Sequence, residues 1–344
     1  MKLSEFKYEY PEELIAEYPA EKRDESNMMV VDREEQEIEH RIFKDIVDYL
    51  REGDVLVLNK TKVYPARIYA HKRRTGAEVE LLLLRELSEN LWEVSVNPAR
   101  KVRIGNKLAI TDDIICDVVD NTVSGGRVVR FKDVTQEELY DIIDERGEIP
   151  LPPYIDREPE EEDKDRYQTV YAEERGSVAA PTSGLHFTED LLDEIEDIGV
   201  DIQKIILHIG LGTFNPVSVE DLSRHRMDSE YYEIDPEAAQ TLNKAKDEGR
   251  RIIAVGTSVV RALESVKVEN FDIAPDRGWT DEFIYPPYDF NMIDGLITNF
   301  HQPESTLLML VAAFAGYDFI FECYEEAIEN EYRLFSYGDA MFIK

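Results

Sequence analysis

The second half of the chain repeats one pattern: a short apolar run, a polar turn with Gly or Thr, and then an amphipathic segment. Stretches of mainly apolar residues at 205–209, 252–255 and 292–298 each predict a buried strand, and each leads into a turn. Repeated strand–turn–helix units are typical of α/β folds with parallel neighbouring strands. We therefore expect an α/β fold built on a parallel sheet or barrel.

Helix start and stop signals support this pattern. Thr188 is expected to cap one helix, and Asp235 to cap a second one. The second helix would have Pro236 at its first position and end at Gly249. A third, apolar helix is expected to open at Pro303.

Residues 78–131 follow a different pattern, because short strand-like runs are divided by Gly, Asn and Pro. We expect a small β domain at 69–149, inserted into a main α/β domain formed by 1–68 and 150–344. The length of 344 residues agrees with two domains, since single domains usually have about 100–200 residues.

The chain is strongly acidic, with 74 Asp and Glu against 39 Lys and Arg and a formal net charge of −35. The acidic residues are spread along the chain, whereas a basic partner would favour one acidic block. Hydrated carboxylates oppose aggregation in high salt, so we expect a halophilic source. The hydrophobic content of 43% is that of a globular protein, and the acidity is therefore no sign of disorder.

The cysteines and the lengths of the apolar runs indicate the cellular compartment. Cys116 and Cys323 are far apart and have no metal or redox spacing, which favours a reducing compartment. The N-terminal segment is charged and lacks the apolar stretch of a signal peptide. The longest apolar run, 307–315, has nine residues, whereas a membrane-spanning helix needs about 20. We expect a cytoplasmic protein without a membrane partner.

Two stretches without acidic residues stand out in so acidic a chain. Residues 55–77 and 94–111 contain no Asp or Glu and together hold ten Lys and Arg. Solvated strand faces would also explain basic runs, but in this background the cations favour a polyanion such as RNA or DNA. The expected RNA-binding residues are Lys60, Lys62, Arg67, Lys72, Arg73, Arg74, Arg100, Lys101 and Arg103.

Further stretches without acidic residues contain three of the six histidines, His186, His208 and His301. They lie at or near points where a strand or turn gives way to a helix. In α/β folds, ligands bind beyond the carboxyl ends of parallel strands, so we expect these turns and Gly256 to gather at one mouth of the fold. His186 and His301 favour a functional role, whereas His208 fits a core histidine equally well.

The sequence contains no clear motif for binding a metal ion or a dinucleotide. The spacings of His225 with Asp228 and of His301 with Glu304 are loose and lack supporting cysteines, so no metal is expected. No P-loop is present, and no GxGxxG motif follows a strand.

Six motifs, in order along the chain, point to one known family. They are GSVAAPTSGLHFT (176–188), LHIGLGTFNPV (207–217), AVGTSVVRALES (254–265), FIYPPY (283–288), LITNFHQPESTLLMLVAAFAG (296–316) and YRLFSYGDAMFI (332–343). Together they closely resemble the S-adenosylmethionine:tRNA ribosyltransferase-isomerases of the queuosine pathway. The resemblance runs from the N-terminal YPEELIAEYPAEKRD to the C-terminus.

The resemblance implies a main α/β-barrel-like domain with an inserted small β-barrel. It also implies an enzyme that transfers and isomerises the ribosyl group of S-adenosylmethionine onto 7-aminomethyl-7-deazaguanine at the wobble position of tRNA. The products would be epoxyqueuosine in tRNA, adenine and methionine. S-adenosylmethionine would be a co-substrate, with no catalytic cofactor and no metal. A tRNA-binding relative without catalytic activity is the alternative.

The implied chemistry requires a base near the C5′ hydrogens, which the sulfonium acidifies, and a proton donor to the departing adenine. The catalytic candidates are His301, His186, His208 and Glu230, with base and acid left unassigned. A salt bridge to Glu264 would explain Arg261 as well as a ligand would, and core packing would explain the tyrosines. The substrate-binding candidates are Thr213, Thr257, Arg261, Tyr285, Asn299, Thr306, Tyr337 and Asp339.

The chain departs from the family pattern at several positions. Lys60 and Lys62 stand where Asn or Asp and then Arg are usual. Asp228 stands where a second histidine is common, so a role for that histidine is not carried over. Pro287 replaces the usual Gly, and Val259 replaces Ser, which suggests that a hydroxyl at this position is dispensable.

Overall fold

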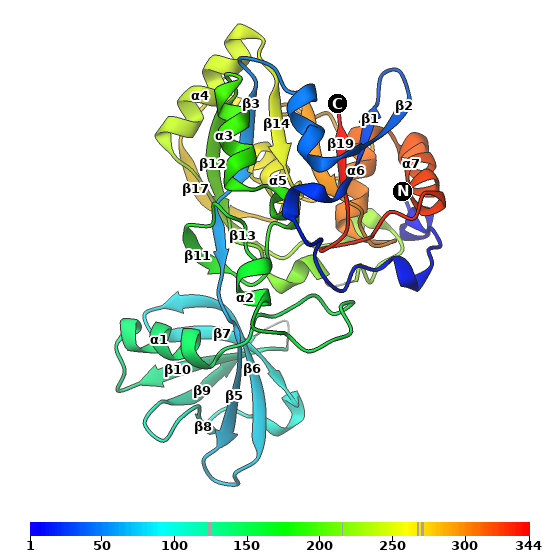
Figure 1. Ribbon diagram of the computed structural model, residues 1–344. Coiled ribbons are helices and arrows are strands. Elements are labelled where there is room, and N and C mark those ends of the chain that lie inside the picture. The colour runs from blue at the N-terminus through cyan, green and yellow to red at the C-terminus, as the bar shows by residue number, and fades with distance from the viewer. Residues whose placement is uncertain (123–124, 215, 267, 270–271) are drawn as a thin grey trace.

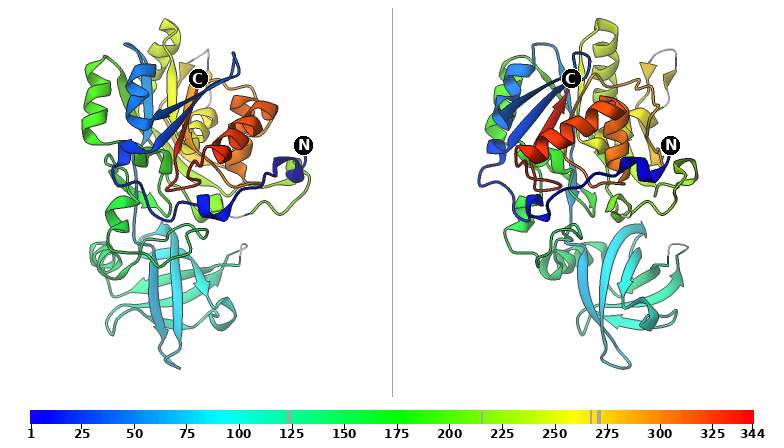
Figure 2. Two further views of the ribbon diagram at one scale, coloured as in Figure 1. Left: turned by 45° about the vertical axis from the view of Figure 1, so that its right-hand side comes forward. Right: turned by 90° about the vertical axis from the view of Figure 1, so that its right-hand side faces the viewer.

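The computed structural model describes residues 1–122, 125–214, 216–266, 268–269 and 272–344. It shows two lobes, a larger one built on a sheet flanked by helices and a smaller one beneath it that consists mainly of β-strands (Figure 1). The two rotated views show the same separation, with the smaller lobe attached at one end of the larger (Figure 2).

The larger lobe contains a nine-stranded mixed sheet. Its four central strands, β12, β3, β14 and β18, run parallel to one another. Strand β19 is antiparallel to β18 and parallel to β1, while β13, β17 and β2 pair antiparallel with their neighbours. In spatial order the strands are β17 (Asp276–Thr280), β13 (Glu230–Ile234), β12 (Asp201–Leu207), β3 (Val55–Asn59), β14 (Ile252–Val255), β18 (Gly295–Asn299), β19 (Ala340–Ile343), β1 (Asn27–Asp32) and β2 (Glu37–Ile42).

The expected α/β-barrel-like main domain is confirmed as a mixed α/β fold, but its sheet is not closed. Within the described residues, the edge strands β17 and β2 each pair on one side only. Closed α/β barrels are built from parallel strands throughout. Here antiparallel pairs, β13 with β17 and β1 with β2, occupy both edges and leave the sheet open.

Side-chain alternation along the strands gives the sheet a hydrophobic layer on each face. In β3, Val55 and Val57 belong to one core, while Leu56 and Leu58 belong to the other. All four side chains are fully buried, as expected for a parallel strand that is covered on both faces. The sheet is therefore the middle of three layers.

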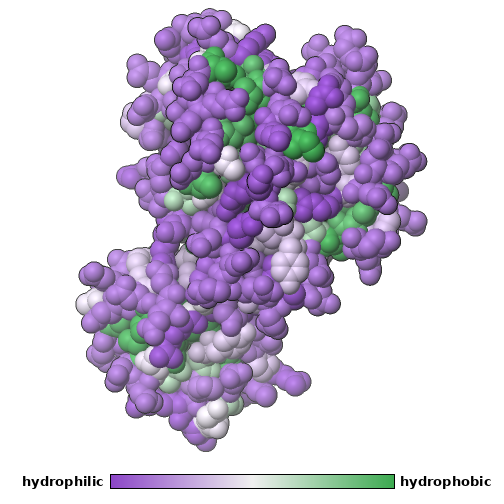
Figure 3. Space-filling model, in the orientation of Figure 1, coloured by the Kyte–Doolittle hydropathy of each residue, from purple (hydrophilic) through white to green (hydrophobic). Residues whose placement is uncertain are grey.

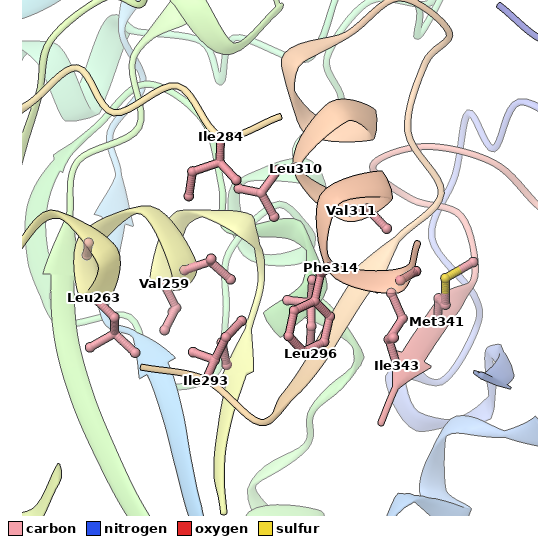
Figure 4. Close-up of a cluster of buried hydrophobic side chains, with 14 of the residues drawn as sticks. Val259, Leu263, Ile284, Ile293, Leu296, Leu310, Val311, Phe314, Met341 and Ile343 are labelled. Carbon is pink, nitrogen blue, oxygen red and sulfur yellow. The ribbon is translucent and has the colours of Figure 1, made fainter. Parts of the chain in front are cut away.

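Different helices cover the two faces. The first core contains side chains of α4 (Pro236–Glu248), α5 (Thr257–Ser265), α6 (Thr306–Ala315) and α7 (Tyr317–Glu329). Figure 4 shows part of it, where Val259 of α5, Leu296 of β18 and Phe314 of α6 lie in one cluster. The second core contains side chains of α3 (Glu189–Asp197) and of the 3-10 helix η4 (Phe43–Tyr49).

The predicted starts of α3 and α4 are confirmed. Thr188 and Asp235 each accept a hydrogen bond from a backbone N–H in the first helical turn, at 3.1 and 2.9 Å. Pro236 is the first residue of α4, and Gly249 ends it with a left-handed φ of 65°, a conformation that glycine adopts without a steric cost.

The prediction that Pro303 opens the third helix is wrong. Helix α6 begins at Thr306, and Ser305 caps it by accepting from the N–H of Leu308 at 3.1 Å. A serine hydroxyl satisfies a free N–H at a helix start, whereas proline supplies only a fixed φ. Pro303 lies in the turn before the cap.

The smaller lobe is a closed six-stranded antiparallel β-barrel, as the resemblance implied. Strand β10 closes it by pairing with both β7 and β9. A separate hydrophobic cluster, which includes Leu81, Trp92 and Phe131, fills the interior. In order the strands are β10 (Arg127–Lys132), β7 (Leu91–Asn97), β6 (Glu78–Ser88), β5 (Arg67–Lys72), β8 (Lys107–Ala109) and β9 (Ile115–Asn121). Helix α1 (Gln136–Arg146) packs Leu139 and Ile143 into the same cluster.

Short elements make up the connections. They are the pairs β4 (Thr61–Val63) with β11 (Glu174–Ser177) and β15 (Val268–Glu269) with β16 (Asp272–Ile273), helix α2 (Asp163–Arg166), and the 3-10 helices η1 (Leu3–Phe6), η2 (Glu12–Leu14), η3 (Arg23–Glu25), η5 (Ala99–Lys101), η6 (Thr182–His186), η7 (Leu211–Phe214) and η8 (Leu222–Arg224).

The surface shown in Figure 3 is predominantly hydrophilic, with hydrophobic residues in small scattered groups. In the described ranges, no single helix has both the length and the hydropathy for crossing a membrane. Helices α6 and α7 meet these two criteria only when taken as a pair, and the pair is bent by 111°.

Candidate functional site

A cavity opens at the carboxyl ends of the central parallel strands. Its empty volume is about 650 Å³, part of which is open to solvent. Asn299 ends β18, Gly256 follows β14, and Ile209 lies two residues beyond β12, and all three line the cavity. Ligands of open α/β sheets bind at this edge.

His301 lies in the cavity wall, just beyond β18. Its Nε2 is 2.8 Å from Thr298 Oγ1, and its backbone N–H donates to the Tyr324 hydroxyl at 2.8 Å. Burial lowers the pKa of His301 to about 3, so the ring is neutral at pH 7. No described residue forms a hydrogen bond to Nδ1, which therefore remains available.

Asn299 connects the cavity wall to His186. Its Oδ1 accepts from the hydroxyls of Thr182 and Ser183 at 3.1 and 3.0 Å. Its Nδ2 lies 3.3 Å from Nε2 of His186. Because an amide nitrogen only donates, Nε2 of His186 accepts, and its proton is on Nδ1, 3.1 Å from Ser26 Oγ. Burial lowers the pKa of His186 to about 4, in agreement with a neutral ring.

His186 itself does not belong to the described wall of this cavity. It lines a second cavity, which shares Ser336 with the first. Its contact with the first cavity is the hydrogen bond to Asn299. This geometry favours a positioning role for His186.

His208 is also absent from the described wall residues. Its Nδ1 lies 2.8 Å from Thr61 Oγ1, and its ring stacks on Tyr231 with the centroids 5.6 Å apart. Gly176 allows the ring this position, because a Cβ there would come within 2.4 Å of it. Burial lowers the pKa of His208 to about 4. Of the two roles considered for His208, these contacts favour packing.

Glu230 and Arg261 form a buried ion pair beside the turn after β12. Their side chains are 5% and 6% exposed, and Arg261 Nη1 donates to Glu230 Oε2. Glu230 Oε1 accepts from the Gly210 N–H at 2.9 Å and from Thr213 Oγ1 at 3.2 Å. Both carboxylate oxygens are thus occupied, and Thr213 is held in the cavity wall. The geometry favours a positioning role for Glu230.

The salt bridge considered between Arg261 and Glu264 is not formed. Glu264 instead accepts from the backbone N–H groups of Asn291 and Met292 at 3.1 and 3.0 Å. Helical spacing alone suggested the wrong partner, because Glu230 comes from strand β13 on another part of the chain.

The other substrate-binding candidates divide into two groups. Thr257, the first residue of α5, lines the cavity directly after Gly256, whose φ of 91° is one that side chains disfavour. The rest are missing from the wall as described, and they are Tyr285, Thr306, Tyr337 and Asp339.

Asp339 and Tyr337 of this second group make structural contacts, and Tyr337 also lines a second cavity together with His186. Asp339 is fully buried and accepts from Arg333 Nη2 at 2.9 Å and Asn27 Nδ2 at 3.1 Å. The Tyr337 hydroxyl donates to Asp163 at 2.7 Å. Asp339 therefore fixes strand β1 to the loop before β19. Its charge also acts on His186, where it opposes the larger lowering of the pKa by burial.

Sequence reasoning missed several polar wall residues. Tyr154 lies in the proline-rich stretch 148–166, outside all six quoted motifs. The others lie inside the quoted motifs, so membership of a motif was the signal that would have found them. They are Thr182, Ser183, Ser258, Gln302, Ser305 and Ser336.

Six of the predicted RNA-binding cations meet at one end of the barrel. Lys72 ends β5, and the turn that follows carries Arg73 and Arg74, at the foot of the smaller lobe in Figure 1. Lys72 Nζ donates to the Lys101 carbonyl at 2.6 Å, which joins this turn to the η5 segment. We call the six residues the barrel tip, namely Lys72, Arg73, Arg74, Arg100, Lys101 and Arg103.

The other three cations lie nearer the larger lobe. Lys60 is 3.6 Å from a carboxylate oxygen of Glu173, and Arg67 is 3.5 Å from one of Glu80. Lys62 is exposed on β4. Lys60 and Arg67 are partly neutralised by these partners, so the barrel tip is the stronger candidate for RNA contact.

The structure shows the surroundings of two departures from the family pattern. Asp228 packs against Gly212, where a Cβ would come within 2.2 Å of its carboxylate. Val259 is fully buried in the core of Figure 4, where a hydroxyl would need a partner. Nothing in the structure explains Pro287.

The described residues contain no group of three or more His, Cys, Asp or Glu side chains placed to share a metal ion. Cys116 and Cys323 are buried in the separate cores of the two lobes and form no disulfide.

The fold and the site define a two-lobed α/β protein whose ligand cavity lies at the carboxyl ends of parallel strands. Of the wall residues that the structure describes, none carries a carboxylate, an ammonium or a guanidinium group. Residues 3–343 match the family described as queuosine biosynthesis protein, and the chain belongs to this family.

Individual relatives agree with this assignment. The chain is 54% identical to an S-adenosylmethionine:tRNA ribosyltransferase-isomerase of Flavobacterium psychrophilum and 52% identical to one of Chloroherpeton thalassium, each over 100% of both chains. It is also similar to the crystal structure of S-adenosylmethionine tRNA ribosyltransferase from Thermotoga maritima, at 39% identity and a TM-score of 0.57, covering 99% of this chain and 100% of that one. The halophilic source expected from composition finds no support in these comparisons.

Proposed function

We propose that this chain transfers the ribosyl group of S-adenosylmethionine to 7-aminomethyl-7-deazaguanine at the wobble position of tRNA and isomerises it, giving epoxyqueuosine, adenine and methionine. One observation carries the proposal. Five of the six motifs that resemble the family, far apart in the sequence, contribute residues to a single cavity at the sheet edge.

The composition of the wall suits the reaction. Its polar groups are hydroxyls, amides and one neutral imidazole, with no charged side chain among the described residues. A carboxylate here would neutralise the sulfonium of S-adenosylmethionine and weaken its pull on the C5′ hydrogens. A wall without carboxylates leaves this charge uncompensated and favours loss of a C5′ proton.

His301 is the catalytic residue in this proposal. A neutral imidazole has one nitrogen that accepts a proton, and burial keeps the His301 ring neutral at pH 7. His301 takes the proton from C5′ and returns it to the departing adenine. The pair of His186 and Asn299 holds this part of the wall in place through the hydroxyls of Thr182 and Ser183.

The two lobes have different roles in this proposal. We propose that 1–68 and 150–344 form the catalytic domain, and that 69–149 form an inserted domain whose barrel tip contacts the tRNA away from the cavity. The cationic barrel tip supplies phosphate contacts that are independent of base sequence. The protein acts in the cytoplasm, where its tRNA substrate is found.

The test is chromatography of the small-molecule products. Purified protein is incubated with S-adenosylmethionine and with tRNA that carries either the deazaguanine amine or an unmodified guanine at the wobble position. We expect adenine and methionine to appear in equal amounts, and only with the modified tRNA. Salt-sensitive binding of the modified tRNA without either product would contradict the proposal and identify a binding protein.

A further inference from the structure

A second cavity, with an empty volume of about 250 Å³, adjoins the first, since Ser336 lines both. Its wall contains two arginines, Arg23 of η3 and Arg166 at the end of α2, together with His186. Both arginine side chains are partly buried. The main cavity has no cation in its described wall, so the two cavities differ in charge.

The two arginines donate to backbone carbonyls and not to carboxylates. Arg23 donates to the backbone carbonyls of Leu185 and Asp165 at 3.1 and 2.9 Å, and Arg166 donates to that of Ala20. Neither forms a salt bridge with any described side chain, although the chain has 74 acidic residues. Other partly or fully buried arginines do pair with carboxylates, and they include Arg157, Arg251, Arg261 and Arg333.

The unpaired charges act on each other. Burial lowers the pKa of Arg23, and the nearby charge of Arg166 lowers it further, while the charge of Asp165 opposes both in part. Two like charges in a partly buried site repel each other unless an anion lies between them. Each guanidinium has five N–H donors, and the bonds to carbonyls use two groups of Arg23 and one of Arg166. Donors therefore remain for a ligand.

We propose that Arg23 and Arg166 bind a backbone phosphate of the RNA next to the modified nucleotide. The proposal rests on the proposed function, because it assumes that the modified base enters the main cavity. A phosphodiester has two non-bridging oxygens, which match two guanidinium forks. Since the cavities meet at Ser336, a nucleotide whose base occupies the first brings its own phosphate to the second.

The carboxylate of S-adenosylmethionine is the competing anion, and the experiment separates the two. Arg23→Gln and Arg166→Gln are compared with Arg33→Gln, a control at another half-buried arginine that donates to a carbonyl. The probe is an anticodon stem-loop RNA, with its affinity measured by fluorescence anisotropy at several KCl concentrations. Affinity for S-adenosylmethionine is measured by calorimetry.

Each of the two test variants should bind the RNA about tenfold more weakly, as expected for the loss of a charge-assisted contact. The slope of log affinity against log salt should become shallower by about 0.7, the contribution of one phosphate on a single strand. Arg33→Gln should change neither quantity. Unchanged RNA affinity in both test variants, or loss of S-adenosylmethionine affinity alone, would overturn the proposal.

An uncharged linkage in the RNA backbone identifies which phosphate contacts the two arginines. One methylphosphonate is placed in turn at each position that flanks the wobble nucleotide. One of them should weaken binding to the unaltered protein and have no effect on Arg23→Gln, because the contact is already absent. Arg23→Lys keeps the charge and controls for misfolding, and it should retain most of the salt slope. These measurements need no turnover, so absence of adenine release would refute the proposed function and leave the phosphate site standing.

Discussion

Removal of one partner from the buried pair of Glu230 and Arg261 should strongly destabilise the larger lobe. Both side chains are at most 6% exposed, and loss of one charge leaves the other buried and unpaired, at a cost of about 3–5 kcal/mol. Domains unfold with a total free energy of about 5–15 kcal/mol, so this loss is a large fraction. Arg261→Met should therefore lower the urea midpoint markedly, as followed by circular dichroism.

The double variant tests the reasoning itself. Glu230→Gln with Arg261→Met removes both charges, and the Gln side-chain oxygen still accepts from the Gly210 N–H. It should be more stable than Arg261→Met alone, with a coupling of at least about 1 kcal/mol. The exposed pair of Arg41 and Glu39 is the control, where a single change should cost below about 1 kcal/mol. A loss in Arg261→Met as small as that of the control would refute the assignment of a buried ion pair. If Glu230→Gln stays folded but abolishes turnover at saturating substrate, the positioning role is wrong and a catalytic one is right.

Three further predictions concern catalysis, RNA and pH. His301→Gln should lower turnover by about 10²–10⁴-fold, the usual contribution of a general acid–base group, with circular dichroism unchanged, and wild-type turnover would rule out His301 as the base. Reversal of Lys72, Arg73 and Arg74 to Glu should weaken tRNA binding in anisotropy far more than S-adenosylmethionine binding in calorimetry, and equal losses would argue against separate sites. His186, His208 and His301 have folded pKa values of about 3 to 4, below the ordinary 6.5, so the unfolded state binds more protons between these values. Stability should therefore fall as the pH drops from about 6.5 towards 4, by up to about 1.4 kcal/mol per pH unit for each histidine. Urea midpoints at pH 7 and 5 check this, and the fall should be smaller in His301→Gln.

Local sequence signals predicted the elements that depend on interactions between residues close together in the sequence. The caps at Thr188 and Asp235 were predictable because a side-chain acceptor meets an N–H only three residues away. The β14 strand over 252–255 was predicted with its observed bounds, since a continuous apolar run between turns is typical of a buried strand. Closure of the sheet was not predictable, because it depends on which distant strands occupy the edges.

In the candidate site, too, some features were predictable from the sequence and others were not. His186, His208, His301 and Gly256 were predicted to gather at one mouth of the fold, because parallel strands place their carboxyl ends together. Gly256 and His301 do line one cavity, whereas His186 and His208 are missing from its described wall. The partner of Arg261 was missed, since Glu230 is 31 residues away along the chain and no periodicity links them. Arg23 and Arg166 gave no signal, because an arginine without a carboxylate partner is recognised only in three dimensions.

The position of β19 has a consequence for folding during synthesis. This strand comes last in chain order, yet it lies between β18 and β1. Strands β1 and β2 therefore cannot join the sheet beside the parallel strands until β19 has been synthesised. The N-terminal hairpin of β1 and β2 therefore remains unpaired on that side until more than 300 further residues have left the ribosome. Such late closure of distant contacts slows folding and leaves an open strand edge exposed meanwhile, so newly made chains should depend on chaperones until β19 is in place.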